Sequence, residues 1–231
     1  MTTLLDFPYH GCEDLNFKRH IEKVIAGEYA TFLTSFRGRP TILDIGGNIG
    51  SFAYWALKQY PNAQVVAFEP SKKNCQSFMK NMRDANIQPW SYTLIQSVVL
   101  DRDDKFATIY KSEVNDGMHS TYSSMTNTEN PESFQAPIMK PQDLPDCQIL
   151  KMDTEGCEVE ILKAYLGSHT NIPDVISFEF HNFLDQLTLD DLLQNDYIIA
   201  SGKIVSPALG TLNYVHKDVV EAYYRENNLS F

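Results

Sequence analysis

The chain has 231 residues, 43% of them hydrophobic, which is enough for one sizeable α/β core without a second domain. Its 30 acidic side chains outnumber the 19 basic ones and give a formal charge of -11, which disfavours general binding to nucleic acid or to an anionic membrane. The four cysteines form no CxxC pair and lack metal-type spacing, so we expect free thiols. The polar N-terminus lacks a signal-peptide core and no later apolar run could span a bilayer, so we expect a cytoplasmic protein.

The first 40 residues are expected to form a helical cap. Apolar residues at mixed helical spacing predict a helix over residues 15–36, packed beside the sheet of the domain that follows. Residues 41–231 are predicted to form that single domain.

Strands and helices alternate through the middle of the chain. The patterns predict strands at 41–45, 64–69 and 93–99 and helices at 51–60 and 72–85. Such alternation implies parallel strands joined by right-handed crossovers. Residues 105–111 alternate like an added edge strand, and the long polar stretch 112–136 after them is predicted to be a lid loop.

The second half continues the alternation. The predicted elements are strands at 147–152, 174–180, 197–201 and 211–216 and helices at 156–166, 187–195 and 218–226. The close link between the last two strands indicates an antiparallel edge. The sequence therefore predicts an α/β fold with a mixed, mostly parallel sheet of about seven strands and helices on both faces.

Residues 41–51, Thr-Ile-Leu-Asp-Ile-Gly-Gly-Asn-Ile-Gly-Ser, carry a candidate cofactor site, because a buried strand passes through glycines directly into a helix. The order of the glycines fails the G-x-G-x-x-G template, and the P-loop ending is absent. A carboxylate at Asp44 would repel a pyrophosphate and suits a cationic ligand. S-adenosylmethionine carries a sulfonium and an ammonium and no phosphate, so it is the favoured cofactor. The candidate binding residues in this turn are Asp44, Gly46, Gly47, Asn48 and Gly50.

The next two strands add candidate cofactor contacts. Glu69 ends the second strand, where an acid can accept hydrogen bonds from both ribose hydroxyls. A nicotinamide cofactor would use an acid at the same place, so Glu69 alone does not distinguish the two. Ser97 and Val98, near the end of the third strand, are expected beside the adenine ring.

Four later residues are the candidates for catalysis. Lys151 and Asp153 alternate at the end of an apolar strand, where charge must be paired or functional. Period two puts Glu179 and His181 on one face of the next strand, close to Asp153 if the strands are neighbours. We expect Asp153 and His181 near an acceptor hydroxyl, with a base of pKa near working pH. Glu179 would orient the base and Lys151 would balance charge, while a structural core histidine is the alternative for His181.

Metal use and acceptor contacts follow from the same region. A divalent cation held by Asp153, Glu155 or Glu179 could lower the pKa of the hydroxyl, but hard ions usually need more ligands, so metal-free base catalysis ranks first. Glu155 either binds substrate or, like Glu158, stabilises the start of the next helix. The candidates for binding a polyol acceptor are His119, Ser120, Tyr122 and Glu155. The remaining histidines, His20 among them, receive no role.

Four motifs together resemble the FkbM family of S-adenosylmethionine-dependent methyltransferases. They are Asp-Ile-Gly-Gly-Asn-Ile-Gly at 44–50, Phe-Glu-Pro at 68–70, Leu-Lys-Met-Asp-Thr-Glu-Gly-Cys-Glu at 150–158 and Ser-Phe-Glu-Phe-His at 177–181. The first two are shared with many class I methyltransferases, and the third is more specific to this family. The resemblance covers residues 41–215 and implies a seven-stranded Rossmann-like fold and methyl transfer to oxygen, often on a sugar or a natural product. Gly47, Thr154 and Cys157 depart from the residues frequent in the family without removing a polar group.

The predicted function is therefore that of an S-adenosylmethionine-dependent O-methyltransferase acting on a hydroxyl of a sugar or glycan and releasing S-adenosylhomocysteine. A small natural product, a lipid or an amine is the alternative acceptor. A nicotinamide-dependent oxidoreductase and a non-catalytic binding protein of the same fold rank lower. No nucleic-acid or membrane partner is expected, and a homodimer is left open.

Overall fold

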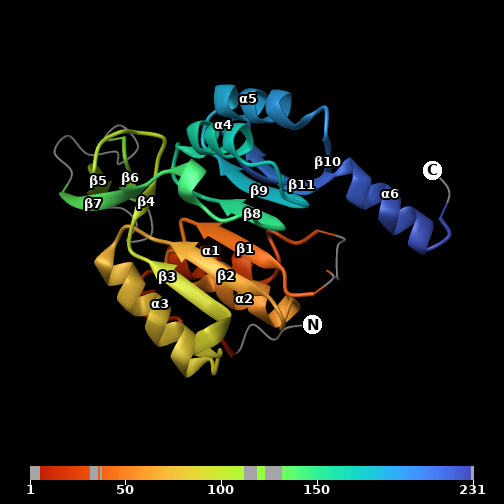
Figure 1. The fold of residues 1–231 in the computed structure, drawn as a ribbon. Helices are drawn as coiled ribbons and strands as arrows, with labels where there is room; N and C mark the ends of the chain where they lie inside the picture. The colour runs from red at the N-terminus through yellow and green to blue at the C-terminus, as the bar shows by residue number, and fades with distance from the viewer. Residues whose placement is uncertain (1–5, 32–35, 37, 112–118, 123–131, 230–231) are drawn as a thin grey trace.

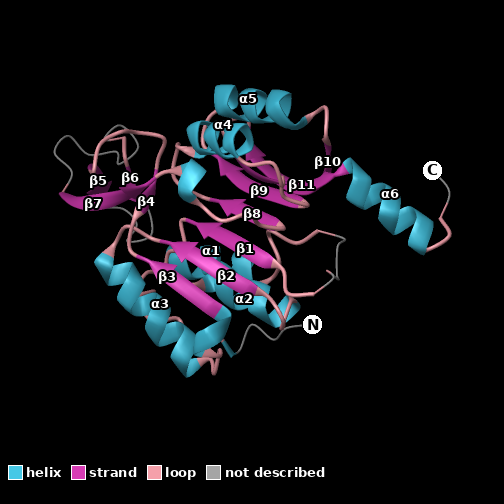
Figure 2. Ribbon diagram, viewed as in Figure 1, coloured by secondary structure: helices cyan, strands magenta, loops and turns pink. Residues whose placement is uncertain are grey.

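A computed structural model describes residues 6–31, 36, 38–111, 119–122 and 132–229 of the chain. Its centre is a sheet of seven strands in the order β10-β11-β9-β8-β1-β2-β3 (Figures 1 and 2). The strands are β1 (Thr41–Ile45), β2 (Gln64–Phe68), β3 (Tyr92–Ile95), β8 (Ile149–Met152), β9 (Val175–Phe180), β10 (Tyr197–Ser206) and β11 (Leu209–His216). The five neighbouring strands β3, β2, β1, β8 and β9 are parallel to one another, and β11 is antiparallel to both of its neighbours, β9 and β10. The predicted mixed, mostly parallel sheet is confirmed.

Helices cover both faces of this sheet. They are α1 (Leu15–Ile25), α2 (Ser51–Gln59), α3 (Lys72–Asp84), α4 (Glu158–Ser168), α5 (Phe183–Leu193) and α6 (Lys217–Glu226). Neighbouring residues of β1 point to opposite faces, as a pleated strand requires. Ile42 belongs to the core formed with α1, α2 and α3, whereas Leu43 belongs to the core formed with α4 and α5. Burial of both faces explains why the central strands are continuously apolar.

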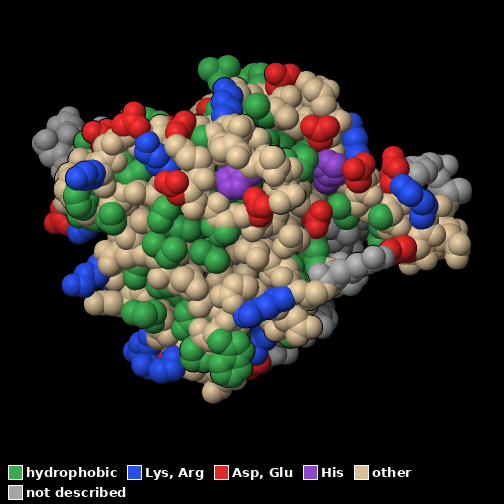
Figure 3. All heavy atoms as spheres, in the orientation of Figure 1, with side chains coloured by type: hydrophobic (Ala, Val, Ile, Leu, Met, Phe, Trp, Pro, Cys, Tyr) green, Lys and Arg blue, Asp and Glu red, His purple; other side chains and the backbone are tan. Residues whose placement is uncertain are grey.

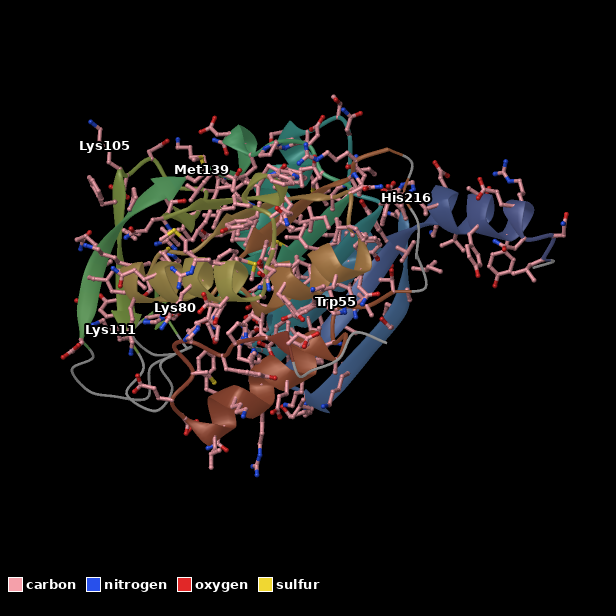
Figure 4. The ribbon with its side chains drawn as sticks, turned by 90° about the horizontal axis from the view of Figure 1, so that it is seen from below. Trp55, Lys80, Lys105, Lys111, Met139 and His216 are labelled. Carbon is pink, nitrogen blue, oxygen red and sulfur yellow. The ribbon has the colours of Figure 1, made fainter. Side chains whose placement is uncertain are left out.

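A smaller sheet of four strands lies beside the carboxyl end of the main one (Figure 1). Its order is β4-β7-β5-β6, with β4 (Val98–Val99), β7 (Ser133–Met139), β5 (Phe106–Lys111) and β6 (His119–Ser120). Figure 4 shows Lys105 and Lys111 at the two ends of β5, at the end of the molecule opposite His216 and α6.

The small sheet corrects three predictions. The strand expected at 93–99 is two strands, of which β3 belongs to the main sheet and β4 to the small one. The strand expected at 105–111 pairs with β7 in the small sheet and does not extend the main one. Alternation shows that a strand has an exposed and a buried face, but it does not tell which sheet the strand joins. The polar stretch expected to be one lid loop contains β6 and the start of β7, while residues 112–118 and 123–131 lie outside the described part of the chain.

The N-terminal helix is shorter than predicted. Asp14 caps α1 by accepting hydrogen bonds from the backbone N–H groups of Asn16 and Phe17. The helix ends at Ile25, before Gly27 turns the chain at φ +99°, a conformation that terminates helices. It packs on α2 beside the sheet, as expected, and the domain boundary at residue 40 stays a prediction.

The other helices begin and end within three residues of the predicted positions, except that α5 begins at Phe183, where the side chain of Asn182 caps it. Among the described helices, none is both long enough and apolar enough to cross a bilayer. On the face drawn in Figure 3, acidic, basic and apolar side chains are interspersed. All four cysteines are free thiols, as predicted.

Candidate active site

The glycine turn between β1 and α2 is pressed against the end of β8. Gly46 has φ +82°, and a Cβ atom there would lie 1.9 Å from the carbonyl oxygen of Asp153. Gly50 has φ +89°, and a Cβ atom would approach Met82 to 2.9 Å and Phe78 to 3.0 Å. Positive φ and close approach both require glycine. The turn therefore brings bare backbone to the carboxyl edge of the sheet.

A buried ion pair between Asp44 and Lys151 stabilises the glycine turn. Asp44 is 0% and Lys151 3% exposed, and the Lys151 ammonium lies 3.1 Å from Oδ1 of Asp44. Lys151 also donates a 2.7 Å hydrogen bond to the carbonyl oxygen of Gly46. Burial raises the pKa of Asp44, although the charge of Lys151 acts to lower it. Burial acts to lower the pKa of Lys151, but the charges of Asp44 and Asp153 outweigh burial and raise that pKa. Lys151 thus pairs with Asp44 and holds the backbone of the turn at Gly46.

Glu69, directly after β2, also stabilises the glycine turn by a hydrogen bond to its backbone. Its Oε2 accepts a 2.8 Å hydrogen bond from the backbone N–H of Asn48, and its Oε1 accepts from the N–H of Ser71 at 2.8 Å and from Nδ2 of Asn74 at 3.3 Å. Burial raises the pKa of Glu69 to about 7 despite these donors. A carboxylate has about four acceptor positions, so capacity for one more donor remains.

Ser97 and Val98 line a hollow between the main sheet and the small sheet, about 380 Å³ with its open mouth included. Its other walls are Ile45, Gly46, Phe68, Pro70, Val99, Ile109, His119, Thr121, Asp153 and Thr154. Ser97 is 4% exposed, and its hydroxyl has no hydrogen-bond partner among the described residues. Mostly apolar walls with one unsatisfied hydroxyl suit a flat heterocycle that offers a polar edge.

A second hollow, about 750 Å³ with its mouth included, contains the acidic residues. It is lined by Phe17, His20, Gly46, Asn48, His119, Asp153, Glu155, Glu179, His181 and Leu209. Gly46, His119 and Asp153 line both hollows. The two hollows therefore meet at the glycine turn and the end of β8, and we call the second one the acidic hollow.

Asp153, Glu179 and His181 come together in the acidic hollow as predicted, with one potential ligand atom of each within 4.8 Å of the others. His181 Nε2 lies 3.1 Å from Oε2 of Glu155 and 3.5 Å from Oε2 of Glu179. The hydroxyl of Tyr29 donates to Oδ2 of Asp153 at 3.3 Å. Neighbouring parallel strands place these groups, since Met152 of β8 is in register with Phe178 of β9.

The charge state of His181 differs from the prediction. Burial would lower its pKa, but the carboxylates of Glu155, Glu179 and Glu158 raise the pKa of His181 to about 12. Burial also opposes ionisation of Asp153, yet Lys151 keeps the pKa of Asp153 below its usual value. An imidazolium among carboxylates donates hydrogen bonds and does not take a proton, which favours a carboxylate over His181 as the acceptor of a hydroxyl proton.

The segment after β8 explains the roles of its acids. Glu158 is 1% exposed and accepts hydrogen bonds from the N–H and hydroxyl of Thr154 and from the N–H of Gly156. It stabilises the start of α4, as expected. Glu155 has φ +55°, a strained conformation for a residue with a side chain, and lines the acidic hollow.

The three candidates from the polar stretch separate in space. His119 lines both hollows. Ser120 donates a 2.8 Å hydrogen bond to the carbonyl oxygen of Glu155, so it holds the strained turn. Tyr122 is 41% exposed beside Arg102 and is not among the described residues that line either hollow.

Sequence reasoning missed three walls of the acidic hollow. Phe17 and His20 lie one turn apart on α1, and Leu209 begins β11. Helical spacing places Phe17 and His20 near one face, but no local pattern tells that α1 reaches the carboxyl edge of the sheet. His20, which was given no role, is therefore a site residue by position.

Comparisons with known proteins agree with this architecture. The pattern of the methyltransferase FkbM domain matches residues 44–199. Methyltransferase 1 of Beauveria bassiana (strain ARSEF 2860) is 24% identical over 163 residues, which cover 60% of this chain and 63% of that protein. The chain therefore spans less than two thirds of this curated relative.

Two solved structures share the fold. Methyltransferase FkbM from Methylobacillus flagellatus KT superposes with a TM-score of 0.54 at 19% identity, over 80% of this chain and 45% of that one. Precorrin-6y C5,15-methyltransferase from Geobacter metallireducens GS-15 gives a TM-score of 0.50 at 13% identity, over 86% and 88% of the two chains. These likenesses confirm the predicted Rossmann-like methyltransferase fold.

Proposed function

Because the chain belongs to the FkbM methyltransferase family, we propose that it catalyses the S-adenosylmethionine-dependent methylation of a hydroxyl group on a sugar or glycan. The observation that carries this proposal is the meeting of the two hollows at Gly46, His119 and Asp153. A donor on one side and an acceptor on the other would face each other at that point. The family match favours this activity over a nicotinamide-dependent oxidoreductase.

The residues present fit the donor. S-adenosylmethionine supplies an electrophilic methyl group on a sulfonium. Gly46 lines both hollows and could offer its backbone to the amino-acid part of the donor, and the unsatisfied hydroxyl of Ser97 suits a polar edge of adenine. Glu69 keeps capacity to accept a hydrogen bond from a ribose hydroxyl. Asp44, buried and paired with Lys151, supports the turn that the donor would contact.

The acidic hollow suits a polyol acceptor. Carboxylates of Asp153, Glu155 and Glu179 line it and can accept hydrogen bonds from several hydroxyls. In the transfer, the acceptor oxygen forms a bond to the methyl carbon as the carbon–sulfur bond breaks, and the hydroxyl proton passes to a carboxylate. Alignment of the two reactants supplies most of the acceleration in such a displacement. Glycan recognition rests on this polar lining and stays a proposal.

The test measures donor binding and transfer separately. Calorimetry should show saturable binding of S-adenosylmethionine and S-adenosylhomocysteine, and mass spectrometry should detect one added methyl group on a member of a panel of partly methylated glycans and small alcohols. Asp153→Ala should abolish transfer and keep donor binding. Retention of a dinucleotide in place of S-adenosylmethionine would overturn the proposal, and methylation of amines alone would overturn the choice of a hydroxyl.

A further inference from the structure

We propose that Asp153, Glu179 and His181 bind a divalent metal ion with mixed oxygen and nitrogen ligands at the floor of the acidic hollow. Binding of the ion follows from these residues alone, whereas its suggested task, activating the acceptor hydroxyl, rests on the proposed function. Four observations carry the site: geometry, charge, unsatisfied atoms and openness.

The geometry matches a coordination shell. One ligand atom from each residue lies within 4.8 Å of the other two. Opposite ligands of an ion bound at Mg²⁺-like distances lie roughly 4.2 Å apart, and those of a Ca²⁺-like ion about 5 Å apart. Small side-chain rotations would therefore close the shell. The ligands lie at the ends of β8 and β9, which are paired in register, so the scaffold is rigid.

The charges around the site are unbalanced. Asp153, Glu155 and Glu179 bring three carboxylates to the hollow, and Glu158 brings a fourth within 4.0 Å of His181 Nδ1. Besides His181, the histidines among the described walls of the hollow are His20 of α1 and His119 of β6. Lys151 is engaged by Asp44 and by the carbonyl oxygen of Gly46. A bound dication would neutralise part of this excess of negative charge.

Two buried atoms at the cluster lack hydrogen bonds. The side chain of His181 is 8% exposed, and its Nδ1 has no hydrogen-bond partner among the described residues. Oε2 of Glu155 is likewise buried without a hydrogen bond from that part of the chain, although His181 lies close enough for an ion pair. Buried polar atoms are nearly always satisfied. Nε2 is the nitrogen of His181 that faces Glu155 and Glu179, so a water bound to the ion would satisfy Oε2 of Glu155, while Nδ1 faces Glu158.

The ligand set also narrows the ion. Two carboxylates and one imidazole suit Mn²⁺ and related transition metals better than Ca²⁺. From the sequence alone, metal-free catalysis ranks first because hard ions usually need more ligands than the sequence supplies. Small divalent ions, however, commonly keep several bound waters and few protein ligands. Because the cluster lines an open hollow, water or an acceptor hydroxyl can occupy the remaining positions. Coordination would lower the pKa of that hydroxyl.

Mn²⁺ titration of the chelator-treated, dialysed chain tests the site, with bound ion followed by electron paramagnetic resonance. We expect one saturable site per chain. Asp153→Asn and Glu179→Gln should each weaken Mn²⁺ binding by more than about tenfold, since loss of even an outer-shell partner costs about 10–100-fold. Glu221→Gln removes an acid from α6, remote from the hollow, and should leave binding unchanged.

The outcomes separate the two proposals. Absence of a saturable site, or equal Mn²⁺ affinity in the chain and in both cluster variants, overturns the metal site. Each variant is checked by near-ultraviolet circular dichroism, and if one fails to fold, the other decides. Normal Mn²⁺ binding without transfer to any acceptor contradicts the proposed function but not the site. Full methyl transfer in the chelator-treated chain overturns the catalytic task of the ion.

Discussion

Replacing Gly46 by alanine tests whether the glycine turn is a steric device. The new Cβ would lie 1.9 Å from the carbonyl oxygen of Asp153, and the residue would have to keep φ +82°. The left-handed conformation costs about 1–2 kcal/mol for a residue with a side chain. Overpacking against backbone costs about 1–3 kcal/mol more. The total, about 2–5 kcal/mol, is a large part of the roughly 5–15 kcal/mol that stabilises a domain.

Gly38→Ala is the matched control. Gly38 has nearly the same backbone angle, φ +77°, but a Cβ there would have no atom of the described residues within 4 Å. Urea unfolding should therefore show a loss of about 1–2 kcal/mol for Gly38→Ala and a larger loss for Gly46→Ala. Because relief of the clash must displace Asp153, only Gly46→Ala should also reduce methyl transfer. Equal losses of stability in the two variants would refute the argument that the turn and the end of β8 are in steric contact.

Three further predictions follow from buried polar groups. Lys151→Met should destabilise the chain by about 3–5 kcal/mol in urea unfolding because Asp44 is left as an uncompensated buried charge; the double variant with Asp44→Asn should recover part of the loss, and no recovery would argue against the pairing. Burial raises the pKa of Glu69 from 4.5 to about 7, so its contribution to stability is complete below pH 4.5 and is lost as the pH rises through 7. Glu69→Gln should make the unfolding free energy less dependent on pH over that interval, and an unchanged slope would contradict the burial effect. Ser97→Ala should leave stability nearly unchanged, since the hydroxyl has no partner to lose in the described part of the chain, but should weaken S-adenosylmethionine binding about 2- to 10-fold in calorimetry; unaltered affinity would remove Ser97 from the donor site.

Local patterns were sufficient for the central strands and for the cluster at their ends. The apolar runs of β1, β2, β8 and β9 have few alternatives to a doubly covered parallel sheet. Period two also placed Glu179 and His181 together, and parallel pairing of β8 with β9 brought Asp153 to them.

Long-range packing defined what local patterns missed. The split between β3 and β4 depends on which strand Val98 meets, and that partner, β7, is about forty residues further along the chain. The charge of His181 depends on Glu155 and Glu158, which reach it only because the segment between β8 and α4 turns through a strained conformation. His20 enters the hollow through the packing of α1, which its own sequence does not specify.

The walls of the acidic hollow come from two kinds of sequence. Gly46, Asp153 and His181 fall inside the stretch that matches the FkbM domain, residues 44–199. Phe17, His20 and Leu209 fall outside it. The candidate catalytic groups and the walls that α1 and β11 contribute are thus encoded in separate stretches of the sequence. Under the proposed function, exchange of the α1 segment between relatives would alter acceptor choice and keep the reaction, so selectivity would diversify without rebuilding the catalytic centre.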